Sequence, residues 1–152
     1  MYRYIDHNEK DDISLHDCRA TKITFTDGTL SFHFGDGFYV GKDNPNNKTG
    51  KFCYTDRSEL RFRASPDDVT VYIFTETEEE TKAIRKTIPL EALAEKLDGG
   101  MELEFTMTYR GYRSFLLEGW LWFDEEPYCR ECSVYLSAGE ADYCWNHLTP
   151  EA

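Results

Sequence analysis

The sequence contains no long hydrophobic run and no even set of cysteines. No apolar stretch approaches the roughly 20 residues that a membrane-spanning helix needs. Residues 1–10 contain neither an apolar stretch nor a cleavage signal, so we expect a cytoplasmic protein. The five cysteines are an odd number, and cytoplasmic thiols stay reduced, which argues against a disulfide framework.

Basic residues are also scarce. The chain has 17 Lys and Arg against 29 Asp and Glu, which gives a net charge of -12. Such a surface repels nucleic acids and anionic lipids, so we expect neither as a partner, whereas a basic protein would be attracted. The sequence also lacks a Gly-rich phosphate loop, a G-x-S-x-G elbow and an H-E-x-x-H motif, and therefore favours a non-enzymatic protein.

Packing side chains, in contrast, are abundant. Of the 152 residues, 40% are hydrophobic and 15% aromatic, enough for one folded domain spanning residues 1–152. The pattern predicts a mainly β (α+β) fold, an antiparallel β-barrel or sandwich of about eight or nine strands with one short helix at about 89–97.

The clearest local signal is a β-hairpin at residues 20–26 and 29–34. Both segments alternate polar and apolar residues, and Asp27-Gly28 between them favours a type I′ turn. With Thr26 opposite Thr29, the apolar residues of both strands share one face. A second turn at residues 35–37 predicts a third strand in the same sheet at residues 38–40.

Further strands are predicted at residues 59–64, 69–75 and 82–88, with a solvated hairpin tip at 76–80. In the predicted helix, apolar residues at i, i+3, i+4 and i+7 form one stripe, and Gly99-Gly100 ends it. Strict alternation then puts every second residue from Met101 to Tyr109 on one face, paired with residues 113–123. That last strand is apolar on both faces, which is typical of a central strand.

Residues 15–38 carry a hydrophobic-His-Asp entry (Leu15-His16-Asp17) into the first hairpin, followed by Gly37-Phe38. In this segment the chain resembles small uncharacterised bacterial and phage β-proteins, including toxin-immunity families. The resemblance implies a cytoplasmic protein of unknown or inhibitory function, and it implies no functional residues.

One segment predicts a specific chemistry. Cys129, Cys132, Cys144 and His147 form C-x2-C-x11-C-x2-H, the two pairs of ligands that a structural zinc ion uses. A hairpin within residues 128–148, folded about Ala138-Gly139, would bring the pairs together, so we expect a zinc-stapled C-terminal hairpin. The alternatives are a redox C-x2-C motif and plain buried cysteines. Because neighbouring strand residues face opposite ways, Cys144 and His147 converge only if the strand breaks between them.

Two other groups of residues could carry chemistry. His16 and Cys18 could form a nucleophile and its base, or belong to an ordinary turn. On the predicted register Glu102 and Glu118 lie close together, as paired carboxylates or as part of a solvated sheet face, which also carries Glu104.

Tyrosine and tryptophan exceed what a small core needs, and these residues anchor interfaces. The surplus comprises Tyr39, Tyr54, Tyr72, Tyr109, Tyr112, Tyr128, Tyr143, Trp120, Trp122 and Trp145. We therefore expect a protein-binding domain, immunity- or inhibitor-like, with an acidic and aromatic surface for a basic protein. The alternative is an enzyme or small-ligand carrier that uses a cavity lined by residues 113–123; self-association through an edge strand is a third hypothesis.

Overall fold

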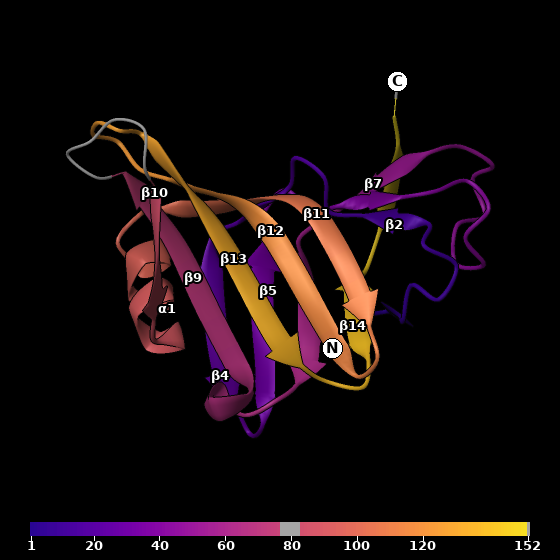
Figure 1. The fold of residues 1–152 in the computed structure, drawn as a ribbon. Coiled ribbons are helices and arrows are strands. Elements are labelled where there is room, and N and C mark those ends of the chain that lie inside the picture. Colours follow the sequence, from indigo (N-terminus) through magenta and orange to yellow (C-terminus); the bar gives the residue numbers. More distant parts are fainter. Residues whose placement is uncertain (77–82, 152) are drawn as a thin grey trace.

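The computed structural model describes residues 1–76 and 83–151, which form three antiparallel sheets and one α-helix (Figure 1). The predicted mainly β class is confirmed, with 54% of residues in strands and 8% helical. The described residues contain fifteen strands rather than eight or nine, because strands of two or three residues are too short for alternation to reveal. The sheets do not close into one barrel.

The two larger sheets face each other across the hydrophobic core. Phe32 of one sheet packs edge-on against Phe105 of the other, with ring centroids 5.7 Å apart, and Phe62 packs against Phe115 at 5.0 Å. The five-stranded sheet has the order β1 (Tyr4–Asp6), β14 (Ala141–Trp145), β8 (Ser58–Arg63), β5 (Thr29–Phe34) and β4 (Lys22–Thr26).

The first hairpin forms with the predicted register. Thr26 pairs with Thr29, Phe25 with Leu30 and Ile23 with Phe32. Asp27 and Gly28 both have positive φ, 52° and 75°, as a type I′ turn requires. Phe25 alone among the apolar residues of this hairpin is exposed, because it lies at the tip of the sheet.

The predicted third strand belongs elsewhere. Tyr39–Val40 (β6) pairs with β7 (Cys53–Thr55) and β2 (Ile13–Ser14) in a small end sheet, which β15 (Leu148–Pro150) completes. Gly37 has a φ of 77°, and a Cβ there would overlap the carbonyl of Thr55. At this close approach the chain leaves the first sheet. The prediction that residues 38–40 form a third strand beside the first hairpin was therefore wrong.

The six-stranded sheet carries most of the remaining predicted strands. Its order is β10 (Ala83–Ile88), β9 (Val69–Glu76), β13 (Cys129–Ser137), β12 (Ser114–Trp122), β11 (Glu102–Gly111) and β3 (Arg19–Ala20), and a short 3-10 helix, Pro66–Asp68, precedes β9. As predicted, β12 is central. The tip predicted at residues 76–80 lies, beyond Glu76, outside the described residues.

The register of β11 against β12 differs from the predicted one for two reasons. The chain turns at Tyr112-Arg113, which puts Gly111 opposite Ser114, and a β-bulge lies between Phe105 and Met107. Phe105 pairs with Gly119 on the core side, and Met107 pairs with Glu118 on the outer side. The extra residue, Thr106, reverses the alternation, so Met107 and Tyr109 lie on the face opposite the core.

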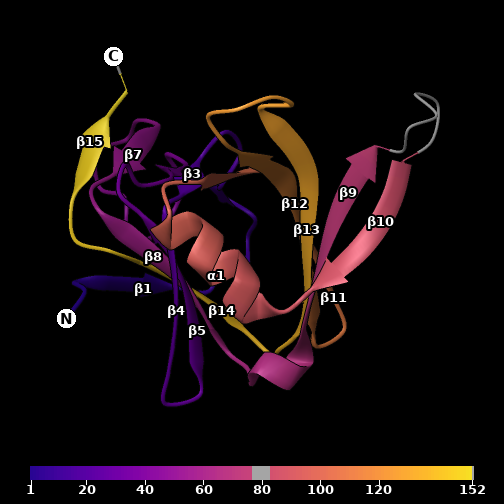
Figure 2. The ribbon, with the colours of Figure 1, turned by 90° about the vertical axis from the view of Figure 1, so that its left-hand side faces the viewer.

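The helix is confirmed as α1, Leu90–Asp98, with Leu90, Leu93 and Leu97 buried. It contacts β4 and β9 and occupies the opening between the two larger sheets (Figure 2). The apolar side of α1 therefore covers the core at one end, and the helix leaves the outer face of the six-stranded sheet uncovered. No helix of the described residues is long and apolar enough to cross a membrane.

The C-terminal hairpin predicted within residues 128–148 does not form. β13 pairs with β12 and β9, whereas β14 pairs with β1 and β8 in the other sheet. The chain around Ala138-Gly139 crosses from one sheet to the other instead of folding back. The core drives this crossover, because Val134 and Leu136 on β13 and Tyr143 and Trp145 on β14 are all buried.

Candidate functional site

The sheet registers place aromatic and long apolar side chains on the outer face of the six-stranded sheet. This face is turned toward the viewer in Figure 1. No described helix or strand packs over this face in Figures 1 and 2. We call it the aromatic face, and it comprises Tyr72, Phe74, Met107, Tyr109, Leu116, Trp120, Trp122 and Tyr135.

Strand alternation explains why these residues point outward. On β12, Phe115, Leu117, Gly119 and Leu121 are buried, and the residues that alternate with them are only partly covered. The bulge in β11 adds two more side chains, Met107 at 49% exposed and Tyr109 at 47%. The apolar second face predicted for this strand therefore exists, but it is open to solvent.

Trp120 lies at the centre of three glutamates on this face. The register pairs it with Glu104 on β11 and Glu131 on β13, and Glu118 precedes it by two residues on the same side of β12. Within residues 1–76 and 83–151, neither Glu118 nor Glu131 forms an ion pair. A hollow of about 300 Å³ opens at this place, lined in part by Phe74, Trp120, Glu131 and Arg130.

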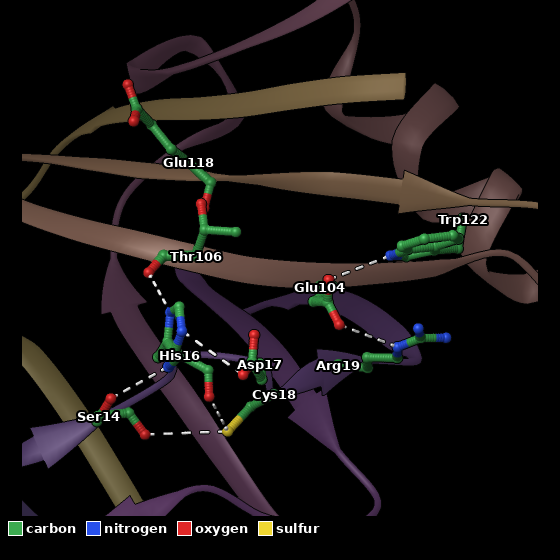
Figure 3. Close-up of polar contacts among 9 residues, drawn as sticks. All are labelled: Ser14, His16, Asp17, Cys18, Arg19, Glu104, Thr106, Glu118 and Trp122. Carbon is green, nitrogen blue, oxygen red and sulfur yellow. Dashed lines mark hydrogen bonds and ion pairs between the residues drawn. The ribbon is translucent and has the colours of Figure 1, made fainter. Parts of the chain in front are cut away.

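One edge of the aromatic face already holds a guanidinium group (Figure 3). The Arg19 guanidinium lies 5.0 Å from the Trp122 ring centroid, donates a hydrogen bond of 3.1 Å to Glu102 and lies 3.5 Å from Glu104. The hydrogen bond to Glu102 and the nearby carboxylates raise the pKa of Arg19.

A second arginine stacks at the opposite side of the face. The Arg85 guanidinium lies 4.4 Å from the centre of the Tyr72 ring. Cations are attracted to the π-face of aromatic rings, and carboxylates beside the ring add charge-assisted hydrogen bonds. Rings and glutamates in this arrangement form a surface suited to arginine and lysine side chains.

The predicted carboxylate pair does not form. Glu118 lies opposite Met107, whereas Glu104 lies opposite Trp120 and Glu102 lies opposite Trp122. Glu118 is therefore two residues along β12 from the partner of Glu104 and four from the partner of Glu102. The turn at Tyr112-Arg113 and the bulge at Thr106 together account for the difference, because they place Glu102 two positions away from its predicted partner on β12.

His16 and Cys18 do not form a nucleophile and base (Figure 3). The His16 ring contacts the carbonyl of Thr106 at 2.9 Å and the carboxylate of Asp17 at 3.5 Å. The Cys18 thiol instead points to the carbonyls of Ser14 and His16, and burial raises its pKa to about 12. The segment therefore acts as a turn that ties the N-terminal part of the chain to β11.

The four predicted zinc ligands lie apart. Cys129 and Cys132 point to opposite faces of β13, while Cys144 is buried on β14 in the other sheet and His147 is exposed beyond it. The strand does break after Trp145, but the backbone N–H of His147 donates to Asp56 at 2.9 Å. Among the described residues, these four are not part of any group of three or more metal-ligating atoms within 4.8 Å. Zinc binding stays a prediction, without a preformed site in this fold.

The structure does bring together His7, Glu140 and Asp142. No sequence pattern indicates this group, because His7 lies more than a hundred residues before the two carboxylates. His7 Nδ1 lies 3.0 Å from the Asp142 carboxylate and 3.3 Å from the carbonyl of Ala141. Burial opposes the charged ring, but that carbonyl and both carboxylates outweigh it, so the pKa of His7 is raised. The contacts are those of an ion pair that holds β1 against β14.

The aromatic surplus noted in the sequence is divided by the fold. Tyr143 and Trp145 are buried in the core, whereas Tyr72, Tyr109, Trp120 and Trp122 lie on the aromatic face.

No protein-family model matches the chain, and searches of curated proteins and of solved structures return no significant match. The resemblance of residues 15–38 to toxin-immunity families therefore stays a prediction.

Proposed function

We propose that this protein is a non-enzymatic binding domain whose aromatic face recognises an arginine- and lysine-rich segment of another protein. The observation that carries the proposal is the Arg19 cluster. There the chain's own guanidinium is stacked on Trp122 and bonded to Glu102, next to a second tryptophan surrounded by glutamates.

In the proposed complex an incoming arginine stacks on Trp120 as Arg19 stacks on Trp122. Glu118 and Glu131 hold the guanidinium, and the hollow beside Phe74 accepts the rest of the side chain. Aromatic anchors surrounded by polar groups are common hot spots of protein interfaces. The net charge of -12 would also speed association with a basic partner. Neutralisation of a basic toxin or nuclease is the sharpest form of this function.

A binding titration tests the proposal with a labelled peptide in which arginine alternates with glycine. We expect this peptide to bind, its lysine counterpart to bind more weakly, and its glutamate counterpart not to bind, because a guanidinium stacks better than an ammonium. Raising the salt concentration should weaken binding. Equal binding of the arginine and glutamate peptides would sink the idea.

Variants locate the site. Trp120→Ala should weaken binding about tenfold, the equivalent of roughly 1.4 kcal/mol, because it removes the stacking surface. Phe25→Ala is the matched control, since Phe25 is also an exposed aromatic strand residue but lies at the tip of the five-stranded sheet. Glu118→Gln should weaken binding more than Glu91→Gln, because Glu91 lies on the exposed side of α1, away from the aromatic face.

A further inference from the structure

A second hollow lies on the inward side of the six-stranded sheet, beside α1. It shares Thr75 and Arg130 with the hollow at Trp120, but none of the residues of the aromatic face lines it. It has a volume of about 420 Å³, within the roughly 300–1,000 Å³ typical of small-molecule sites. Its walls include Ile73, Leu121 and Phe123, and its charged side chains are Lys86, Lys96 and Arg130.

The sheet register explains how the cations reach this place. Lys86 pairs with Ile73 across β10 and β9, and Arg130 pairs with Leu121 across β13 and β12. Each cation therefore shares a face of the sheet with a buried apolar residue. Lys96, from the last turn of α1, adds the third charge.

The charge of this hollow is opposite to that of the chain. Acidic residues outnumber basic ones by 29 to 17, yet no carboxylate lines it among the described residues. The four other hollows described in this fold each have at least one, for example Glu131, Asp6, Asp11 or Asp17. In the described residues, Lys86, Lys96 and Arg130 also lie within 4.0 Å of no carboxylate.

We propose that this hollow binds the anion of a fatty acid. The carboxylate would lie among the three cations, and the acyl chain would lie on Ile73, Leu121 and Phe123. A simple anion would gain nothing from the apolar walls, and an uncharged apolar ligand would leave the three cations that line the hollow without a counter-charge. An amphipathic carboxylate pairs with the cations and also contacts the apolar walls. An arginine can bind such a carboxylate with two hydrogen bonds.

Calorimetric titration with dodecanoate, below the concentration at which it forms micelles, tests the proposal. We expect dodecanoate to bind, and acetate and dodecylammonium not to bind. If acetate binds equally well, the hollow is a simple anion site. If dodecylammonium binds equally well, only apolar contact is involved. Either outcome overturns the proposal.

Charge-removing variants then locate the site. Lys86→Met and Lys96→Met should each weaken dodecanoate binding about two- to fivefold, and the double variant about tenfold, as expected for partly exposed ion pairs. Lys48→Met, in an exposed loop, is the matched control and should change nothing. Wild-type affinity in the double variant would contradict the proposal. Trp120→Ala should leave dodecanoate binding unchanged, so failure here and failure of the peptide-binding function are distinguishable.

Discussion

The close contact at Gly119 offers a sharp test of the bulged register that builds the aromatic face. A Cβ added at Gly119 would overlap the carbonyl oxygen of Glu104 and lie 2.9 Å from its carbon and 3.2 Å from Cα of Phe105. These atoms belong to the backbone of the paired strand, so no side-chain rotation can relieve the overlap. Gly119→Ala therefore forces β11 and β12 apart beside the bulge.

Overpacking costs about 1–3 kcal/mol, and a backbone contact places Gly119→Ala at the upper end, about 3 kcal/mol. For a domain of this size each kcal/mol lowers Tm by roughly 2–4 °C, so we expect a loss of roughly 6–12 °C. The measurement is thermal unfolding followed by circular dichroism. Near-wild-type stability would show that Gly119 does not lie against Glu104, and the register would be refuted.

Gly139→Ala is the matched control. A Cβ at this position meets nothing within 4 Å, and its φ lies outside the left-handed region. Removing a glycine at such a site stabilises a protein by about 0.4–1 kcal/mol, because the unfolded chain loses freedom. Tm should therefore stay the same or rise slightly, and a large loss would mean that the chain between β13 and β14 is packed differently.

Three further predictions concern other parts of the fold. Cys129 should react rapidly with a thiol reagent and the four other cysteines slowly, since only Cys129 is not buried; fast labelling of more than one thiol in native protein would contradict this. Asn44 donates hydrogen bonds to Asp6 and Asp12, so Asn44→Ala should cost about 2–4 kcal/mol in a denaturant titration, and a loss below about 1 kcal/mol would argue against these bonds. The raised pKa of His7 stabilises the fold below pH 6.5, and this contribution is lost as pH rises through the folded-state pKa. Burial lowers the pKa of His33, so its contribution is present above pH 6.5 and is lost as pH falls. Replacing each histidine by Gln should change the pH dependence of unfolding with opposite sign, and changes of the same sign would refute both directions.

Local patterns in the sequence predicted the local structure well. The Asp27-Gly28 turn and the alternation around it determined the first hairpin and its register, because neighbouring strands joined by two residues have only one pairing that puts all apolar side chains together. The apolar stripe at Leu90, Leu93 and Leu97 predicted the helix in the same way.

Long-range pairing could not be read from the sequence. The crossover at Ala138-Gly139 resembles a hairpin turn locally, and only the burial of Tyr143 and Trp145 in the other sheet distinguishes the two. The predicted zinc site required that hairpin. Because the hairpin does not form, the four predicted ligands lie apart. The bulge at Thr106 likewise leaves no local signal, although it decides that Tyr109 points outward.

The candidate site could be predicted only in part from the sequence, because its residues come from several strands. Tyrosine and tryptophan enrichment predicted an exposed aromatic surface, but not which residues would share it. Trp120, Glu104 and Glu131 come from three strands, and their grouping follows from pairings that form only in the folded sheet. Arg19, on the short strand β3, completes the edge of the face from a position distant in sequence.

The most direct test of the aromatic face uses the three tryptophan indole N–H signals in a proton–nitrogen NMR spectrum. Addition of the arginine–glycine peptide should shift the signals of Trp120 and Trp122, while the signal of Trp145, which is 0% exposed, stays in place as an internal control. The glutamate–glycine peptide should shift none of the three. An unchanged Trp120 signal in the presence of saturating arginine peptide would contradict the proposed function.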